Sequence, residues 1–171
     1  MVYYKIYFKI KIVKGGIFLN TENYITSIRK YVGHAPLLTI GAWLLVINEK
    51  EEVLMQLRAD FNSWDFPGGT MELGETIEAV AKRELKEETN LDVDDIKIID
   101  VFSGKDTYRK YPNGDELYVV SVLCEIRKFH GDLLINDGES KILKWFKKDE
   151  IPENLSPVAK KYIDKIKEYL N

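Results

Sequence analysis

The sequence contains one cysteine and two histidines, and both scarcities exclude kinds of site. A single cysteine, Cys124, cannot form an internal disulfide, and without a Cys-x-x-Cys pair or clustered histidines it offers no zinc site. We therefore expect a reducing, cytoplasmic setting. Because Cys124 lies within an apolar run, the sequence favours a small core residue, with a nucleophile as the alternative.

An excess of positive charge and long apolar segments are also missing. The 25 Lys and Arg against 28 Asp and Glu give a formal net charge of −3. Proteins that bind nucleic acid present a basic face to the phosphates, so we expect no general nucleic-acid binding. No segment approaches the roughly 20 apolar residues of a membrane-spanning helix, and lysines interrupt the apolar N-terminal stretch. We expect neither a membrane span nor a signal peptide.

What remains is the composition of an ordinary globular protein, with 171 residues of which 45% are hydrophobic and 31% charged. This length fits one domain with a sizeable core. The N-terminal segment has a second interpretation, because Lys14-Gly15-Gly16 can be encoded by a ribosome-binding sequence and Leu19 by the start codon UUG. On this interpretation translation starts at Leu19, so residues 1–18 are an N-terminal extension that is not part of the native protein, and 19–171 form the domain. The intact mass of natively expressed protein tests this, and a mass that includes Met1 contradicts it.

Periodicity and turn residues predict a protein of mixed helices and strands. Alternating apolar residues and lysines indicate a strand over 4–13, Asn113-Gly114 marks a turn, and Ser156 followed by Pro157 is typical of a helix start. The predicted helices cover 21–32, 76–89 and 157–170. The predicted strands cover 37–48, 53–57, 96–102, 117–126 and 142–146, the first two of which form a hairpin. Strands mixed with a few helices indicate a sheet between helices.

The most informative segment is an acidic helix that follows a glycine-rich loop. Thr76 is a good N-cap for a run of helix formers that reaches Thr89. At about 100° per residue, apolar residues and three glutamates share one side of this helix, and other residues face outward. The shared side holds Ile77, Val80, Ala81, Leu85, Glu84, Glu87 and Glu88, and the outer side holds Ala79, Lys82, Arg83 and Lys86.

Glu84, Glu87 and Glu88 stand where three effects oppose them. Like charges at this spacing repel by roughly 0.2–0.5 kcal/mol per pair, and carboxylates near a helix C-terminus oppose the macrodipole by roughly 0.3–1 kcal/mol each. Partial burial increases both penalties. A solvated helix face is the alternative, but the phase of the helix and the glycines before it favour a compensating cation. Ligands that are all oxygen predict a hard cation, Mg²⁺ or Mn²⁺.

The same residues resemble the signature of a known family. Gly69, five residues, Glu75, seven residues and then Arg83-Glu84-Leu85-Lys86-Glu87-Glu88-Thr89-Asn90-Leu91 match the Nudix box, G-x5-E-x7-R-E-U-x-E-E-x-G-U with U aliphatic. One position departs, because Asn90 stands where the family has glycine. That glycine ends the helix in a left-handed conformation, for which asparagine is the next-best residue. We expect a slight loss of stability and preserved catalysis.

The resemblance extends from about Tyr24 to the C-terminus and implies an α/β/α sandwich around a mixed β-sheet. It also implies a Mg²⁺-dependent hydrolase, with Mn²⁺ as a second option. The residues that would hold the metal are Gly68, through its carbonyl, with Glu84, Glu87 and Glu88. Arg83 would pair with Glu75. A glutamate outside the box would act as ligand or base; Glu139 is the candidate, with an ordinary turn residue as the alternative, and Glu84 is the other candidate base.

The Nudix box does not identify the substrate. The favoured hypothesis is hydrolysis of the pyrophosphate bond in a nucleoside diphosphate linked to another group, such as ADP-ribose or a nucleotide sugar. The alternatives are hydrolysis of oxidised or non-standard nucleoside triphosphates, a non-catalytic domain that senses a nucleotide, and an acidic helix that binds Ca²⁺. Candidate substrate contacts, for which packing or plain surface charge are the alternatives, are Trp64, Gly69, Lys105, Tyr108 and Arg109. Homodimers are frequent in the family, so a homodimer stays open.

Overall fold

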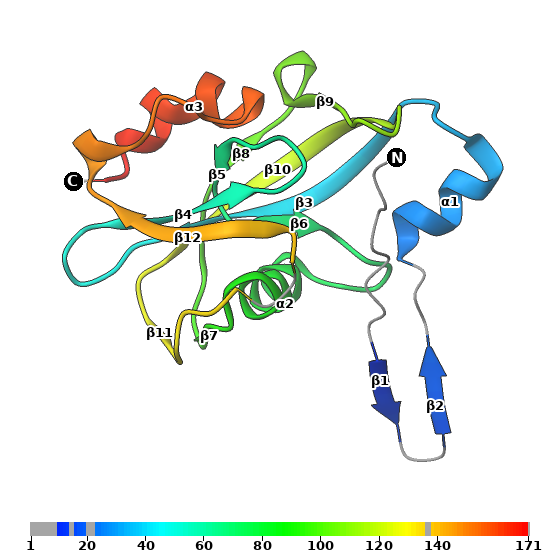
Figure 1. The fold of residues 1–171 in the computed structure, drawn as a ribbon, viewed down its shortest axis with the longest axis horizontal. Helices are drawn as coiled ribbons and strands as arrows, with labels where there is room; N and C mark the ends of the chain where they lie inside the picture. The colour runs from blue at the N-terminus through cyan, green and yellow to red at the C-terminus, as the bar shows by residue number, and fades with distance from the viewer. Residues whose placement is uncertain (1–9, 14–15, 20–22, 136–137, 171) are drawn as a thin grey trace. The chain divides into compact units, whose positions relative to one another are not determined.

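The computed structural model describes residues 10–13, 16–19, 23–135 and 138–170. The chain divides into two units, Met1–His34 and Ala35–Asn171. In the first unit, β1 (Ile10–Val13) and β2 (Gly16–Leu19) pair antiparallel (Figure 1). The predicted extension boundary between residues 18 and 19 falls inside β2. Residues 4–9 of the strand predicted over 4–13 lie outside the described residues.

Helix α1 (Tyr24–Val32) completes the first unit. The side chain of Asn23 accepts a hydrogen bond from the backbone N–H of Thr26 at 2.8 Å, which caps the helix start. Gly33 ends it with φ 59°, and the Gly33 N–H donates to the carbonyl of Arg29 at 2.8 Å. The helix predicted over 21–32 is confirmed from Tyr24 onward, and residues 21–22 lie outside the described ones.

Two β-sheets form the centre of the second unit (Figure 1). The larger has the order β6 (Gly68–Thr70), β3 (Leu37–Val46), β10 (Glu116–Ile126) and β8 (Lys97–Phe102), with β9 (Tyr108–Lys110) also paired to β10. The smaller has the order β12 (Ser140–Phe146), β4 (Val53–Arg58) and β5 (Trp64–Asp65). β11 (Phe129–His130) pairs with β7 (Asp92–Val93). Because β3 and β10 run parallel and the other pairs antiparallel, the larger sheet is mixed.

Helices α2 (Ile77–Thr89) and α3 (Pro157–Lys167) cover opposite faces of these sheets (Figure 1). On β3, Trp43 and Leu45 belong to the core beneath α3, whereas Leu44 and Val46 belong to the core beneath α2. A strand buried on both faces has a nearly continuous apolar sequence, which is what residues 37–48 show. The α/β/α sandwich with a mixed sheet is therefore confirmed. Single turns of 3₁₀ helix follow β8 (Lys105–Thr107) and β12 (Lys148–Glu150).

The hairpin predicted between β3 and β4 is wrong. The turn itself is present, and the side-chain oxygen of Asn48 accepts from the backbone N–H groups of Lys50 and Glu52. Beyond a single bridge between Ile47 and Val53, however, the two strands separate into different sheets. β3 pairs with β10 and β6 instead, so partners distant in sequence replace the nearest strand. The last predicted helix is also shorter than 157–170, because α3 ends at Lys167.

Cys124 is a core residue, as the sequence favours. Its side chain is fully buried in the core beneath α2, and this burial raises the pKa of the thiol to about 12. A buried thiol with a raised pKa stays protonated near neutral pH and is a poor nucleophile. We expect Ellman's reagent at pH 8 to leave the folded protein unmodified and to titrate Cys124 only after unfolding in urea. Rapid modification of the folded protein would contradict this.

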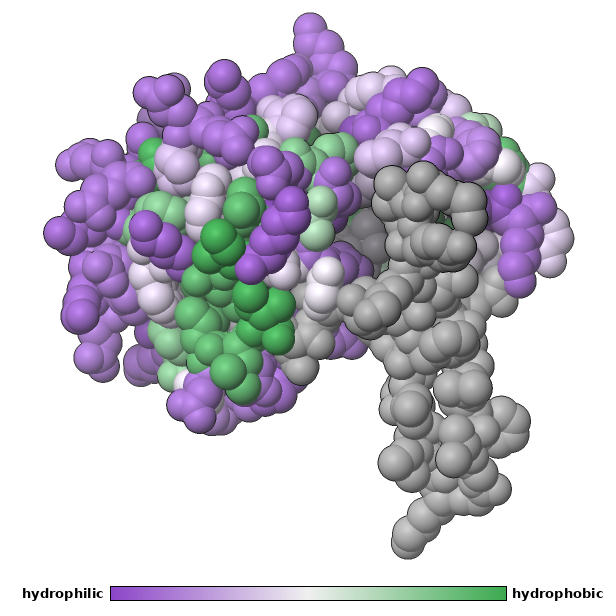
Figure 2. Space-filling model, viewed as in Figure 1, coloured by the Kyte–Doolittle hydropathy of each residue, from purple (hydrophilic) through white to green (hydrophobic). Residues whose placement is uncertain are grey.

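Hydrophobic side chains gather on one face of the second unit, over β12 and the segment before it (Figure 2). The exposed apolar residues of those segments are Leu134, Ile135 and Ile142.

Within the described ranges, no helix has the length and apolar character needed to cross a membrane.

Candidate functional site

Helix α2 begins and ends where the sequence predicts. The hydroxyl of Thr76 accepts from the N–H of Ala79 at 3.2 Å. At the other end Asn90 adopts the left-handed conformation, with φ 64° and ψ 6°. Its backbone N–H donates to the carbonyl of Lys86 at 3.0 Å, and its side-chain amide donates to the carbonyl of Asp132 at 2.9 Å. Asn90 thus takes the glycine's conformation and adds a hydrogen bond that glycine cannot make.

Asn90→Ala is expected to lower the free energy of unfolding by about 2 kcal/mol, because alanine is strained in the left-handed region and loses the hydrogen bond to Asp132. Asn90→Gly loses the hydrogen bond but relieves the strain, so it is expected within about 1 kcal/mol of the wild type. Urea unfolding measures both. An alanine variant as stable as the wild type would show that the helix end does not depend on this residue.

The inward face of α2 has the predicted composition, with one correction. Val80, Ala81 and Leu85 are buried, and so is Glu88, which is 3% exposed. The prediction that Arg83 lies on the outer side is wrong, because its side chain is only 23% exposed and lies among the glutamates. A long arginine side chain can bend away from the direction of its own Cα, and the helical phase does not take this into account.

Arg83 joins three glutamates into one cluster. Its Nε and Nη2 donate to the two carboxylate oxygens of Glu75 at 2.7 and 2.8 Å, which is a bidentate ion pair. Its Nη1 donates to Glu84 and, at 3.3 Å, to Glu87. Nη2 also donates to the carbonyl of Thr70 at 3.0 Å. The hydrogen bonds to Glu75 raise the pKa of Arg83 further above its usual value, so the guanidinium stays charged.

Glu88 is held by a second network. The backbone N–H of Gly68 donates to its Oε2 at 2.7 Å, and the side-chain amide of Gln56 donates to both carboxylate oxygens at 3.3 Å. The amide oxygen of Gln56 accepts from the hydroxyl of Ser140. Gln56 and Ser140 were not among the predicted site residues. The available signal was a glutamine inside the apolar strand β4, because a buried polar side chain requires a partner.

Glycines allow β6, the strand before α2, to lie against the acidic face. A Cβ on Gly69 would lie 2.4 Å from Cδ of Glu84, and a Cβ on Gly41 would lie 2.5 Å from the carbonyl oxygen of Gly69. Both distances are too short for any other residue without movement. Gly41 was also missed, although a glycine inside a strand indicates a close backbone approach. The backbones of Gly41 and Gly69 are therefore in close contact, and Gly69 in turn lies against the carboxylate of Glu84.

The donor set of the cluster fits a hard cation. Among the described residues, no three His, Cys, Asp or Glu side chains are arranged so that they could hold a metal ion as they stand. Instead, Nη1 of Arg83 bridges Glu84 and Glu87 and supplies the positive charge there. A divalent cation would replace Nη1 of Arg83 as the partner of Glu84 and Glu87. Arg83 would keep its contacts with Glu75 and the carbonyl of Thr70. A set of ligands made only of oxygen suits such an ion.

Glu139 lies next to the network of Glu88. Its side chain is exposed, and its carbonyl oxygen accepts from the N–H of Ala59 at 2.8 Å, which fixes its backbone at the end of β4. The following residue, Ser140, donates to Gln56 and so connects to Glu88. Glu139 is thus adjacent in sequence to a residue of the hydrogen-bond network that holds Glu88.

A hollow of about 230 Å³ lies at the start of α3, and two of the predicted substrate contacts, Tyr108 and Arg109, line it. The others lie elsewhere. Lys105 is an exposed residue that does not line this hollow, and Gly69 lies against Glu84. Trp64 packs edge-on against Phe146 with ring centroids 4.9 Å apart, which favours the packing alternative. The full lining is Phe61, Asp65, Tyr108, Arg109, Lys110, Ser156, Pro157 and Val158.

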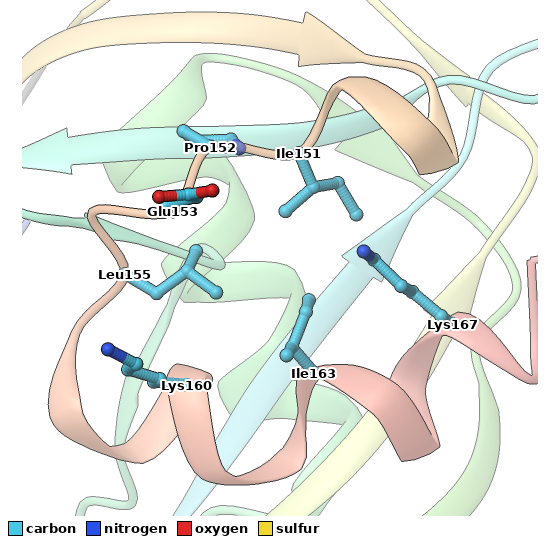
Figure 3. Close-up of a pocket in the computed structure, with 7 residues that line it drawn as sticks. All are labelled: Ile151, Pro152, Glu153, Leu155, Lys160, Ile163 and Lys167. Atoms are coloured by element: carbon cyan, nitrogen blue, oxygen red, sulfur yellow. The ribbon is translucent and has the colours of Figure 1, made fainter.

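A second hollow, of about 240 Å³, lies between α3 and the loop that precedes it (Figure 3). Ile151 and Leu155 of the loop and Ile163 of the helix point into it, and Lys167 extends toward Ile151. Its lining contains none of the glutamates of the box and none of the predicted substrate contacts. This hollow is separate from the acidic cluster.

Comparisons with known proteins agree with the fold. A family model described as NUDIX domain matches residues 37–166. A putative 8-oxo-dGTP diphosphatase of Bacillus subtilis is 30% identical over 129 residues, 75% of this chain and 80% of the relative. A MutT protein structure from Bacillus halodurans is 28% identical with a TM-score of 0.58, covering 74% of this chain and 80% of that one. A MutT Nudix hydrolase structure from Burkholderia pseudomallei, 19% identical, shows the same fold with a TM-score of 0.64 over 76% of this chain and 98% of its own.

Proposed function

Because this chain belongs to the Nudix family and is a pyrophosphohydrolase of that family, we propose that it uses Mg²⁺ to hydrolyse the pyrophosphate bond of a nucleotide at Glu84, Glu87 and Glu88. The observation that carries the proposal is the contact of Arg83 with Glu84 and Glu87 of α2 and with Glu75, which precedes the helix. Arg83 brings one positive charge to three carboxylates, and a divalent cation suits such a concentration of negative charge.

The side chains divide into groups that bind and groups that orient. Glu84, Glu87, Glu88 and the carbonyl of Gly68 would hold the cation, which when bound neutralises charge on the pyrophosphate and lowers the pKa of a coordinated water. Gln56 and the Gly68 N–H orient Glu88. Arg83, locked to Glu75, fixes the loop against the helix. Glu84 or Glu139 accepts the proton of the attacking water.

Two substrate classes remain as candidates. The favoured class, a nucleoside diphosphate linked to another group such as ADP-ribose or a nucleotide sugar, is compatible with the box, which does not distinguish between substrates. The name of the Bacillus subtilis relative supports the alternative, an oxidised nucleoside triphosphate. A non-catalytic nucleotide sensor is disfavoured, because every carboxylate of the box is present.

A substrate panel with Mg²⁺, run for the wild type and Glu88→Gln, tests the proposal. It contains ADP-ribose, GDP- and UDP-sugars, CDP-choline, dinucleoside polyphosphates, oxidised dGTP and triphosphorylated RNA. We expect hydrolysis of at least one compound that disappears in the variant. Tight binding of a nucleotide without hydrolysis of any compound would contradict the proposal and favour the sensor.

A further inference from the structure

The direction of the Gln56 side-chain amide is set by its neighbours. An ionised Glu88 carboxylate and the carbonyl of Phe66 can only accept hydrogen bonds, and the amide nitrogen of Gln56 donates to both at 3.3 Å. The amide oxygen therefore faces the other way, where the hydroxyl of Ser140 donates to it. Gln56 is 1% exposed, so these contacts take the place of water for its two N–H donors and its oxygen.

Ser140 reaches Gln56 because of an irregularity in the pairing of β12 with β4. The two strands are in regular antiparallel register as far as Ile142, which lies opposite Leu57. Ser140 lies opposite Arg58, so the register shifts by one residue between these two positions. A shift of one residue turns a side chain to the other face of a strand, and the hydroxyl of Ser140 thereby lies on the face of Gln56. Bulges of this kind re-aim single side chains.

Gln56 connects Glu88 to the segment that carries Gly68. Phe66 stands two residues before Gly68, and the N–H of Gly68 donates to Oε2 of Glu88 at 2.7 Å. Without the hydroxyl of Ser140, the buried amide oxygen of Gln56 would lose the donor that it has in the structure, which is unfavourable. The amide would then turn or shift toward another donor, and its N–H groups would move away from Glu88.

We propose that Ser140 is a positioning residue of the metal site, whose hydroxyl acts through Gln56 to hold Glu88 in the orientation that binds the cation. The inference rests on the proposed function, because the site that it serves is the one assigned to Glu84, Glu87 and Glu88. Ser140 supplies no ligand and only sets the direction of the amide that fixes one. Removal of a group that orients a metal ligand typically lowers metal affinity by about ten- to hundredfold.

Calorimetric titration of the metal-free full chain with Mn²⁺ alone tests the assignment as a double-mutant cycle. Ser140→Ala should bind Mn²⁺ about tenfold more weakly than the wild type. Gln56→Met, which keeps the length of the side chain but removes the amide, should bind at least as weakly as Ser140→Ala. Because Ser140 acts through Gln56, the double variant should bind no more weakly than Gln56→Met. A merely structural role would lower stability and leave the affinity of the folded protein unchanged.

Ser63→Ala is the matched control. It is the same change at a buried serine whose hydroxyl has no hydrogen-bond partner in the described part of the chain, so it should bind Mn²⁺ as the wild type does. Ser140→Thr keeps the hydroxyl and should also retain the wild-type affinity. Urea unfolding identifies the conditions in which each variant is folded before its affinity is compared.

Wild-type affinity in Ser140→Ala, an equal loss in Ser140→Thr, or losses that add in the double variant would overturn the assignment. Should Ser140→Ala not fold, wild-type affinity in Gln56→Met would overturn it as well. Glu87→Gln separates this inference from the proposed function. If it weakens Mn²⁺ binding and Ser140→Ala does not, only the role of Ser140 fails. If the wild type binds no Mn²⁺, or Glu87→Gln binds it unchanged, the proposed function fails and the role of Ser140 with it.

Discussion

Glu87→Gln is expected to lower kcat/KM about a thousandfold, a loss of about 4 kcal/mol of transition-state stabilisation. The neutral amide keeps the shape of the side chain but removes one of the charges that would hold the cation, and charge stabilisation by a bound metal contributes several kcal/mol. Steady-state kinetics on the substrate found in the panel measures the effect. Lys86→Gln is the control, because Lys86 faces outward beside Glu87 and pairs with Asp92, and it should keep the wild-type kcat/KM.

The same variant should fold normally. Glu87 loses a 3.3 Å contact with Arg83 but also loses repulsion from Glu84 and an unfavourable position near the helix C-terminus. We expect the free energy of unfolding to change by less than about 1 kcal/mol in the absence of metal. A large fall in Tm would show that the carboxylate is structural. Glu88 differs, because Gly68 and Gln56 donate to it in a buried network, so its replacement should also cost stability.

Gly69→Ala is expected to lower kcat about a hundredfold, because displacing a catalytic group by about 1 Å has an effect of this size. The new Cβ would lie 2.4 Å from both Cδ and Oε1 of Glu84, so the carboxylate must move. Gly69 is not among the glycines with positive φ, and the backbone itself tolerates alanine. Kinetics and urea unfolding together separate the two effects.

Gly74→Ala, in the loop between β6 and α2, is the matched control. Gly74 has φ 84°, and nothing lies within 4 Å of an added Cβ, so this variant should lose stability but keep its kcat. If both variants lost kcat equally, the cause would be the conformation of the loop rather than the position of Glu84.

The limits and acidic face of α2 could be predicted from the sequence because helical periodicity and capping are local. Thr76 and Asn90 specify the ends by their own side chains. The hairpin between β3 and β4 was predicted wrongly because strand pairing depends on partners far away in the chain. β3 pairs with β10, and this pairing depends on the packing of both faces of β3 rather than on the turn at Asn48.

The parts of the site that the sequence does not show depend on contacts between distant segments. Gln56 reaches Glu88 across 32 residues, and Ser140 reaches Gln56 across 84. No local pattern connects these positions. In the sequence, Arg109 was a candidate substrate contact or a plain surface charge, and only the fold brings it beside Asp65.

The most direct test of the central claim, that Glu84, Glu87 and Glu88 bind the cation used in hydrolysis, is the rate of nucleotide hydrolysis as a function of Mg²⁺ concentration in the wild type and in Glu87→Gln. We predict no hydrolysis in EDTA, saturable recovery with Mg²⁺ in the wild type, and weak recovery at much higher Mg²⁺ in the variant. Hydrolysis that persists in EDTA, or the same Mg²⁺ dependence in both proteins, would contradict the claim.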